Sequence, residues 1–468
     1  REMSILIGKT HELFPYLDNI AHKANNLYNA CLFRIRQVYT GMLKDEKTRT
    51  PNENSVMEEI AFTAKVCDRF TAPTQKNRLF SYESLYHLLY KTNNPDYMCK
   101  EIPSHVAQQM IKNALRDMKS FHSAKKDYYS GKKTKKKYKN VPKIPNYKVK
   151  GGSCSFTMTN QQARQVDKKI VLPFTKMTLA LGDYVQPHWR LKEVRFTKTH
   201  GIFRAHLIYE EQSLQPRTTS TPKHICAIDL GVNNFAAITN NLGLPGLLIK
   251  GGRIRSINKW YNEVVSRIQS CQTRGTTKKY RPSDQTNRVG LKRENVLNDS
   301  MHKIGKYVIQ YCMANNIDTL VIGNNKEWKQ KSNMGRNTNK RFVPIPYMKF
   351  IEILRYLCER EGINYVLQEE SYTSKASHLD HDYIPTFGDS GIHKFSGVRG
   401  PFRYACHYRE KGFHKLFKRK NGQVVNADLN GSANIGRKAF PEFTCLPSSF
   451  YRIRAIHDSE IEMQKRCF

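Results

Sequence analysis

Long apolar runs and paired cysteines are both missing from this chain of 468 residues. No stretch of about 18 apolar residues occurs, so we expect no membrane-spanning helix. Eleven cysteines are scattered without a C-x-x-C pair, a pattern that favours reduced intracellular thiols over a disulfide framework. The chain opens Arg1-Glu2-Met3, with neither a secretory signal nor an initiator methionine, which is consistent with a start inside a longer protein.

Acidic residues are scarce: 40 Asp and Glu stand against 78 Lys and Arg, a net charge of +38. This balance favours a polyanionic partner, because each phosphate neutralised by Lys or Arg releases condensed counterions. A merely basic soluble protein is the alternative. A membrane-surface role is disfavoured, because the charge is not confined to one amphipathic helix. The length predicts two or more domains.

The amino-terminal quarter is expected to be mostly helical. A short strand at Ser4–Lys9 precedes the helices predicted from apolar residues at helical spacing, which cover Leu13–Tyr39, Leu79–Tyr90 and Ser104–Phe121. Ser104 is the expected N-cap of the last of these, and the polar segment Thr48–Asn54 is expected to be a loop.

A lysine-rich run follows the helices and comprises Lys132, Lys133, Lys135, Lys136, Lys137 and Lys139. We interpret it as a phosphate-contacting loop, with a solvated linker as the alternative. The next stretch predicts a small antiparallel barrel or sheet from short apolar segments punctuated by Gly and Pro, at 155–158, 169–172, 177–181, 191–197 and 202–209.

From His224 the order of elements is informative. Three strands at 225–230, 234–239 and 246–250 are joined by Gly- and Asn-rich turns and are expected to be antiparallel. Helices at 257–271, 291–314 and 347–360 then alternate with strands at 318–323 and 364–368, and a helix at 430–440 closes the set. That order predicts the RNase H arrangement, a mixed sheet with helices on its faces.

Two aspartates lie at the ends of these elements. Asp229 follows the buried strand Ile225–Ile228, and Asp428 precedes the last helix. Each has a plain alternative role, since Asp229 could shape the turn at Gly231 and Asp428 could be an N-cap. Together, in this order of elements, they favour a metal site.

Four sequence blocks carry a family resemblance. A-I-D229-L-G-V-N-N, V-I-G323-N-N-K-E-W-K, E370-S-Y-T-S-K and N-A-D428-L-N-G-S-A-N-I resemble the characteristic blocks of the TnpB family of RNA-guided transposon nucleases, and more closely those of its Fanzor relatives from eukaryotes and giant viruses. The resemblance is strong over residues 224–438 and weaker upstream.

The resemblance implies a multidomain α+β protein with a helical recognition lobe, a small antiparallel β wedge barrel and an RNase H-like (RuvC) nuclease domain. The expected divisions are a wedge strand at 1–15, the recognition lobe at 16–130, a basic linker at 131–145, the wedge at 146–223, the nuclease at 224–440 with an insert at 371–425, and a tail at 441–468.

One departure concerns the third catalytic acid. In the common TnpB pattern the strand at 318–323 ends in a glutamate, but this sequence has Gly323 there. The resemblance to Fanzor proteins points to Glu370 instead, with Glu369 and Glu327 as reserves. Because strand residues alternate between faces, only one of Glu369 and Glu370 is expected to point at the site.

The resemblance implies a magnesium site. Asp229 is expected to bridge two Mg²⁺ ions roughly 4 Å apart, with Glu370 and Asp428 as flanking ligands, because Mg²⁺ prefers hard oxygen ligands. Mn²⁺ is a possible substitute.

Zinc is not expected. Many relatives carry a four-cysteine zinc ribbon in the insert, but 371–425 holds only Cys406. Nearby candidates match no ordinary finger spacing, namely His378, His381, His393 and His407. The insert is instead expected to contact nucleic acid through Arg399, Lys415, Lys418, Arg419 and Lys420.

By resemblance, the chain is an RNA-guided DNA endonuclease that acts as a monomeric ribonucleoprotein. It binds a guide RNA, recognises a short motif beside its double-stranded DNA target and cuts in the RuvC-like site. The alternatives are an RNA-independent transposase or resolvase, and a guide-loaded DNA-binding protein with a decayed site. The expected location is the nucleus of a eukaryotic or virus-infected host, or the cytoplasm of a prokaryote.

Overall fold

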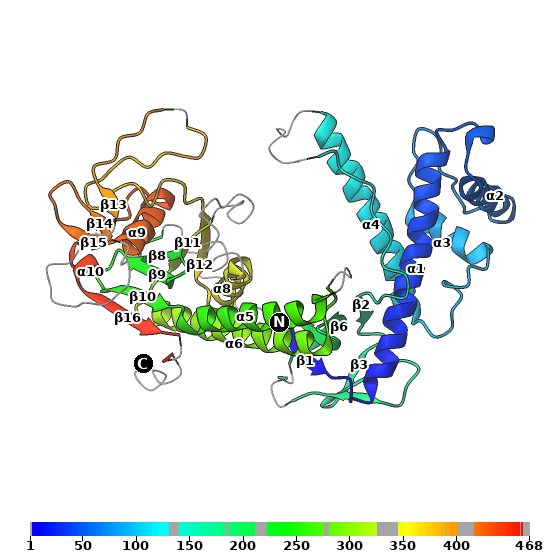
Figure 1. The fold of residues 1–468 in the computed structure, drawn as a ribbon, viewed down its shortest axis with the longest axis horizontal. Helices are drawn as coiled ribbons and strands as arrows, with labels where there is room; N and C mark the ends of the chain where they lie inside the picture. The colour runs from blue at the N-terminus through cyan, green and yellow to red at the C-terminus, as the bar shows by residue number, and fades with distance from the viewer. Residues whose placement is uncertain are drawn as a thin grey trace. The chain divides into compact units, whose positions relative to one another are not determined.

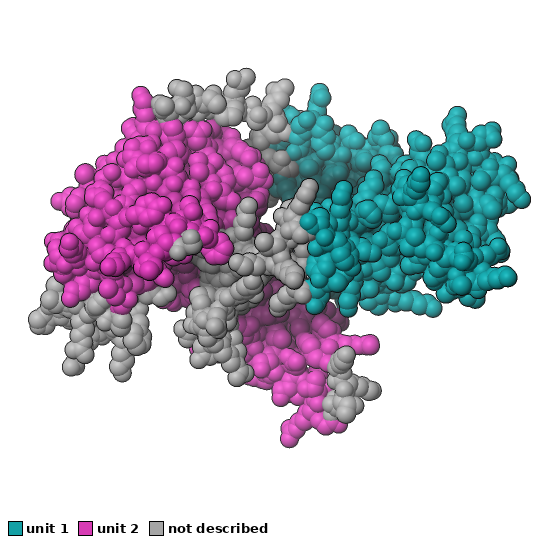
Figure 2. All heavy atoms as spheres, turned by 90° about the horizontal axis from the view of Figure 1, so that it is seen from above, with its two compact units in different colours: residues 1–212 teal, residues 213–468 magenta. Residues whose placement is uncertain are grey.

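The computed structural model describes residues 2–130, 140–182, 185–186, 188–210, 222–275, 280–324, 345–389, 391–400, 416–458 and 460–461. The chain divides into two compact units, residues 1–212 and 213–468, coloured separately in Figure 2. No helix in these ranges is long and apolar enough to span a membrane.

The described residues of unit 1 include four α-helices, labelled in Figure 1: α1 (Leu13–Gly41), α2 (Pro51–Val66), α3 (Tyr82–Lys91) and α4 (Ser104–Tyr129). A short 3₁₀ turn, η1 (Glu46–Thr48), precedes α2. Helix α1 packs against α2 and α4, because its buried residues recur every three or four positions and form one apolar stripe, which includes Leu17, Ile20, Ala24, Leu27, Cys31 and Ile35.

The predicted loop at Thr48–Asn54 is wrong, since α2 begins inside it. The Thr50 hydroxyl accepts from the Glu53 N–H at 3.3 Å, and the Glu53 carboxylate accepts from the Thr50 N–H at 2.9 Å. This capping box, with Pro51 in the first turn, fixes the start of the helix. Ser104 is likewise not an N-cap, because it is the first residue of α4 and Pro103 occupies the cap.

Two antiparallel sheets complete unit 1. The larger has the order β1-β7-β6-β2 and contains β1 (Glu2–Ile7), β2 (Phe156–Thr159), β6 (Arg190–Thr199) and β7 (Ile202–Glu210). The smaller contains β3 (Arg164–Val166), β4 (Lys169–Val171) and β5 (Thr178–Ala180). The antiparallel pairing is as predicted, whereas β3 was not predicted.

Unit 2 is built on a six-stranded sheet of order β12-β11-β8-β9-β10-β16. Strands β8 (Ile225–Leu230), β9 (Asn234–Asn240) and β10 (Gly246–Lys250) are antiparallel, and β11 (Thr319–Gly323) and β12 (Asn364–Gln368) run parallel to β8. This confirms the RNase H arrangement. Strand β16 (Ile453–His457), which was not predicted, adds to β10 in parallel.

Helices cover both faces of this sheet. Alternate residues of β8 belong to different cores: Cys226 and Ile228 pack with α6 (Asp284–Ala314) and α8 (Tyr347–Glu361). Ile225 and Ala227 pack instead with α9 (Ala427–Ala439). Figure 1 shows α9 beside β8 and β9. By this alternation the side chain of Asp229 lies on the α9 face.

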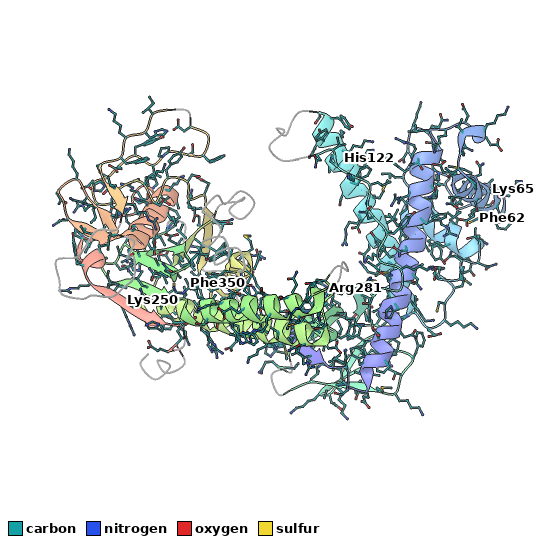
Figure 3. The ribbon with its side chains drawn as sticks, viewed as in Figure 1. Phe62, Lys65, His122, Lys250, Arg281 and Phe350 are labelled. Carbon is teal, nitrogen blue, oxygen red and sulfur yellow. The ribbon has the colours of Figure 1, made fainter. Side chains whose placement is uncertain are left out.

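The remaining elements of unit 2 are smaller or peripheral. Helix α5 (Gly252–Thr273) packs along α6. Strands β13 (Val398–Gly400), β14 (Leu416–Lys418) and β15 (Val424–Asn426) form an antiparallel sheet, and α10 (Ser448–Tyr451) precedes β16. Figure 3 adds the side chains, with Phe350 of α8 and Lys250 at the end of β10 labelled.

Candidate active site

Asp229 lies where β8 approaches α9. A Cβ atom on Gly431 of α9 would lie 2.8 Å from the Asp229 Oδ2, so any larger residue at 431 would displace the carboxylate. The glycine therefore lets the helix backbone approach Asp229 closely.

Glu370 lies at the end of β11, the strand that pairs with β8. Its side chain is 9% exposed, and its Oε2 lies 2.6 Å from the position of a Cβ atom on Gly323. The same Cβ would lie 2.5 Å from the Cδ1 of Ile435. The Glu370 carboxylate thus occupies space that a side chain at position 323 would need.

Strand register brings Glu370 toward Asp229. Ile322 is paired with Ile228 across β11 and β8, so the next position, Gly323, lies beside Asp229. Burial, together with the negative charges of Asp229 and Glu369, raises the pKa of Glu370 to about 9 against the opposing effect of Lys438. The two acids are therefore close enough to repel each other.

Tyr347, at the start of α8, closes this end of the sheet. Its hydroxyl donates to the Gly231 carbonyl at 2.9 Å, which ties the turn after Asp229 to α8. Its pKa is raised, mainly by burial and also by the charges of Asp229 and Glu370.

Glu369 points elsewhere. Its carboxylate accepts from the Lys438 ammonium at 2.5 Å and from the Ser371 N–H at 2.7 Å. Burial acts to raise the pKa of Glu369, but these donors outweigh it and the pKa lies below its usual value. The structure thus separates the two glutamates, as strand alternation predicts.

Asp428 is the second residue of α9 rather than its N-cap. The cap is Asn426, whose side-chain oxygen accepts from the N–H groups of Asp428 and Leu429 at 3.0 and 3.1 Å. The Asp428 carboxylate instead accepts from the Asn234 amide at 2.8 Å and from Arg399 at 3.0 Å. Residues three apart share a helix face, so Asp428 lies one turn from the Gly431 contact with Asp229.

The carboxylates suit a hard cation, although no three His, Cys, Asp or Glu side chains in the described ranges form a group that could hold a metal ion. Burial is the main cause of the raised pKa of Glu370, and repulsion from Asp229 adds to it. A divalent cation between Glu370 and Asp229 would relieve that repulsion. Asp428 is engaged by Arg399, so it would complete the site by exchanging that ion pair for the cation.

The insert contributes exposed cations. Arg399, Lys418 and Lys420 are exposed, while Arg419 is ion-paired with Asp380 at 2.8 Å and donates to the Leu379 carbonyl. The predicted residues Lys132, Lys133, Lys135, Lys136, Lys137, Lys139, Glu327 and Lys415 lie outside the described residues.

Two histidines of the insert, His378 and His393, have protein partners. The His378 Nε2 accepts from the Cys445 N–H at 3.2 Å, and burial lowers its pKa to about 3. His393 lies 3.6 Å from the Asp389 carboxylate.

Three residues at the site were missed by sequence reasoning. Asn234 and Tyr347 contact the site from β9 and α8, and no local pattern signals those contacts. Gly431 could have been suspected, since glycine in a helix interior is unfavourable and calls for a packing reason.

Two stretches of the chain match known families. Residues 206–329 match the OrfB_IS605 family, described as a probable transposase, and residues 347–435 match the Cas12f1-like TNB domain. These two segments make the chain similar to the TnpB family. The transposase match includes Asp229 and Gly323, and the TNB match includes Glu370 and Asp428, so the TnpB-like segments carry all four positions.

No curated protein matches this chain. Among solved structures, it is similar to a Cas12f1–sgRNA–target DNA complex (13% identity, 91% of this chain, 82% of that chain, TM-score 0.43). It is also similar to a CRISPR–Cas12f ternary complex, with 14% identity over 92% of this chain and 82% of that chain and a TM-score of 0.32. A third similar structure is an AacC2c1–sgRNA binary complex, with 9% identity over 89% of this chain and 70% of that chain and a TM-score of 0.29.

Proposed function

We propose that this TnpB-like chain is an RNA-guided DNA endonuclease. The observation that carries the proposal is the Glu370 carboxylate seated over Gly323, beside Asp229, at the carboxyl ends of two parallel strands. Glu370, which follows β12, thereby places its carboxylate at the end of β11, where the common TnpB pattern has its glutamate.

Three further features support the proposal. The sheet has the RNase H order, the two family matches include the three carboxylates, and the net charge of +38 suits polyanionic partners. In this proposal the helices of unit 1 form the recognition lobe, and its larger sheet forms the wedge that binds guide RNA.

Asp229, Glu370 and Asp428 would hold the cations, Mg²⁺ with Mn²⁺ as a substitute. Two such ions, when bound, provide a nucleophile at neutral pH and relieve charge on the leaving oxygen. The protein's own groups orient the ligands: Asn234 holds one oxygen of Asp428, and Tyr347 fixes the turn after Asp229. Arg399, released from Asp428, would contact a phosphate of the DNA.

The same geometry favours the Fanzor-like subset over a decayed site. Gly323, in place of the usual glutamate, is the best evidence in the sequence for a decayed site, but a glycine is what the Glu370 carboxylate requires beneath it. We therefore propose a working relocated glutamate.

RNA dependence is the direct test. The protein is purified with its bound RNA, the RNA is sequenced, and a plasmid carrying the complementary target is incubated with Mg²⁺. We expect cleavage at that target, lost after RNase treatment and restored by adding the RNA back. Site-specific cleavage that survives complete RNA removal would favour the RNA-independent transposase or resolvase, and specific binding without cleavage would favour the guide-loaded binding protein.

A further inference from the structure

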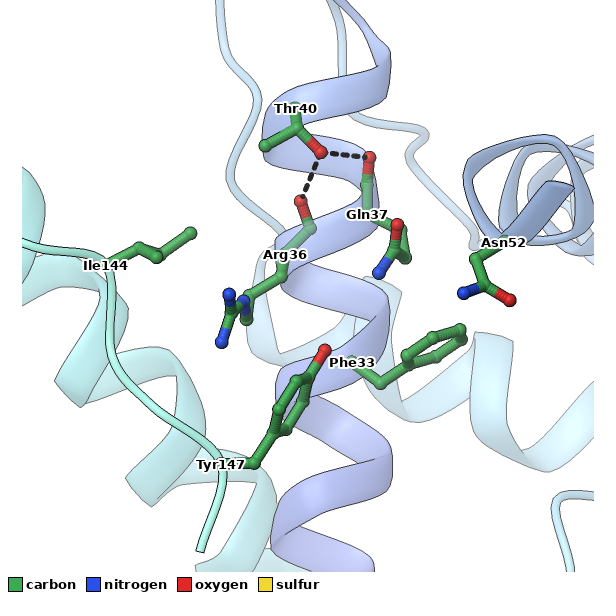
Figure 4. Close-up of a pocket in the computed structure, with 7 residues that line it drawn as sticks. All are labelled: Phe33, Arg36, Gln37, Thr40, Asn52, Ile144 and Tyr147. Atoms are coloured by element: carbon green, nitrogen blue, oxygen red, sulfur yellow. Dashed lines mark hydrogen bonds between the residues drawn. The ribbon is translucent and has the colours of Figure 1, made fainter. Parts of the chain in front are cut away.

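A cavity of about 360 Å³ lies on the surface of unit 1, against α1. Figure 4 shows its lining: α1 supplies Phe33, Arg36, Gln37 and Thr40, α2 supplies Asn52, and the extended segment after the lysine run supplies Ile144 and Tyr147. The volume lies within the range of sites that bind small organic groups.

The segment that forms one wall is fastened to α1. The Arg36 guanidinium donates to the Pro145 carbonyl at 3.1 Å. Asn29 brackets Lys148, donating to its carbonyl at 3.0 Å and accepting from its N–H at 2.8 Å. Because these contacts reach the backbone, the wall is fixed whatever side chains it carries.

The opposite wall is also fixed. Asn52 lies in the first turn of α2, which the Thr50–Glu53 capping box starts. The Glu53 carboxylate is further held by Lys44 at 2.9 Å and by the Thr40 hydroxyl at 2.7 Å. The cavity is therefore held open between two anchored elements.

The lining combines flat surfaces with hydrogen-bonding groups. The guanidinium carbon of Arg36 lies 4.6 Å from the centre of the Tyr147 ring, and Tyr147 is 43% exposed. The amides of Gln37 and Asn52 face the same space, and each has both a donor and an acceptor. This lining therefore suits a flat ligand with hydrogen-bonding groups on its edge better than it suits an apolar ligand.

We propose that this cavity holds one unstacked nucleobase of a nucleic-acid strand. The base stacks on Tyr147, and the amides of Gln37 and Asn52 contact its edge, while the neighbouring Lys143 and Lys148 supply charge for the adjoining phosphates. The inference rests on the proposed function only in taking nucleic acid as the partner.

The test measures binding of single strands of about 12 nucleotides to the full chain freed of RNA, by fluorescence anisotropy. RNA and DNA strands of mixed sequence are compared with strands of the same length that lack bases. We expect Tyr147→Leu to weaken binding roughly tenfold for base-bearing strands of at least one kind and to leave the abasic strands unchanged. The kind of strand affected identifies the source of the base.

Matched variants make the result decisive. Tyr90→Leu removes a tyrosine of similar exposure, 45%, outside the cavity and should leave binding unchanged, and Tyr147→Phe should bind like wild type because it keeps the stacking ring. The slope of log Kd against log salt should not change in Tyr147→Leu, because no phosphate contact is lost.

Equal weakening on base-bearing and abasic strands, or no weakening on either RNA or DNA, would overturn the inference. Either result is independent of guided cleavage. If wild type cuts its target while Tyr147→Leu binds strands normally, only the proposal that the cavity holds a nucleobase is contradicted. Wild type that never cuts, with the base-dependent loss at Tyr147 intact, contradicts the proposed function alone.

Discussion

At the scale of single residues, the candidate site depends on two glycines that leave room for carboxylates. Gly323 lies beneath Glu370 and Gly431 lies against Asp229. The sequence predicts that only one of Glu369 and Glu370 points at the site, and the contacts of Lys438 with Glu369 and of Gly323 with Glu370 favour Glu370.

A methyl group at position 323 should disturb the site. Gly323→Ala places its Cβ within 2.6 Å of Glu370 and of Ile435, so we expect a loss of about 1–3 kcal/mol in the free energy of unfolding from overpacking, together with reduced cleavage. Gly8→Ala is the control, because nothing lies within 4 Å of its Cβ. Unfolding in denaturant measures the stability of Gly323→Ala and of Gly8→Ala. Equal stabilities of the two variants would contradict the close contact between Gly323 and Glu370.

His378 should make stability depend on pH. Burial holds its pKa at about 3, below the ordinary value of about 6.5, so on acidification the unfolded chain takes up a proton that the native protein does not. Stability contributed by the neutral imidazole is therefore present above about pH 6.5 and is lost as pH falls toward 3, by at most about 1.4 kcal/mol per pH unit.

Denaturant unfolding at a series of pH values measures this slope. His378→Gln should be less stable at neutral pH but should have a shallower dependence between about pH 6.5 and 4. Parallel curves for wild type and His378→Gln would show that the imidazole does not titrate as the structure indicates.

At the scale of elements, the long helices and the strands of unit 2 could be predicted because their apolar residues recur at the expected period. Helix α2 could not, since Pro51 and the polar residues around it resemble a turn until Thr50 and Glu53 are recognised as a capping box. Strand β16 was missed because its pairing with β10 joins segments about 200 residues apart in the chain.

The capping box gives a prediction for α2. Thr50→Ala removes the hydroxyl that accepts from Glu53 and should cost about 1 kcal/mol of stability. Ser55→Ala, at an exposed position of the same helix, should change stability by less than about 0.5 kcal/mol. If Thr50→Ala and Ser55→Ala had the same unfolding midpoint in denaturant, the cap would not stabilise the helix.

At the scale of the whole molecule, the order of strands was the most predictive feature, because three antiparallel strands followed by helix–strand alternation permit few topologies. The position of the third acid was less predictable, because it depends on how β12 lies beside β11 and on which face of β12 meets α9. The basic composition indicates a polyanionic partner, but it does not indicate which residues contact that partner.

Binding should therefore depend steeply on salt. Using the Glu370→Gln protein, so that no DNA is cut, we expect log Kd for guided target DNA to rise linearly with log salt, with a slope corresponding to roughly six or more phosphate contacts. Filter binding at several salt concentrations measures the slope, and a slope near zero would contradict an electrostatic role for the charge of +38.

The most direct measurement is cleavage of guide-matched DNA by wild type, Glu370→Gln and Glu369→Gln, each loaded with the same RNA and Mg²⁺. If Glu370 is the relocated acid, Glu370→Gln should bind the target yet cut at least about a hundredfold more slowly, while Glu369→Gln should cut at nearly the wild-type rate. Normal cutting by Glu370→Gln, or loss of cutting confined to Glu369→Gln, would contradict the account.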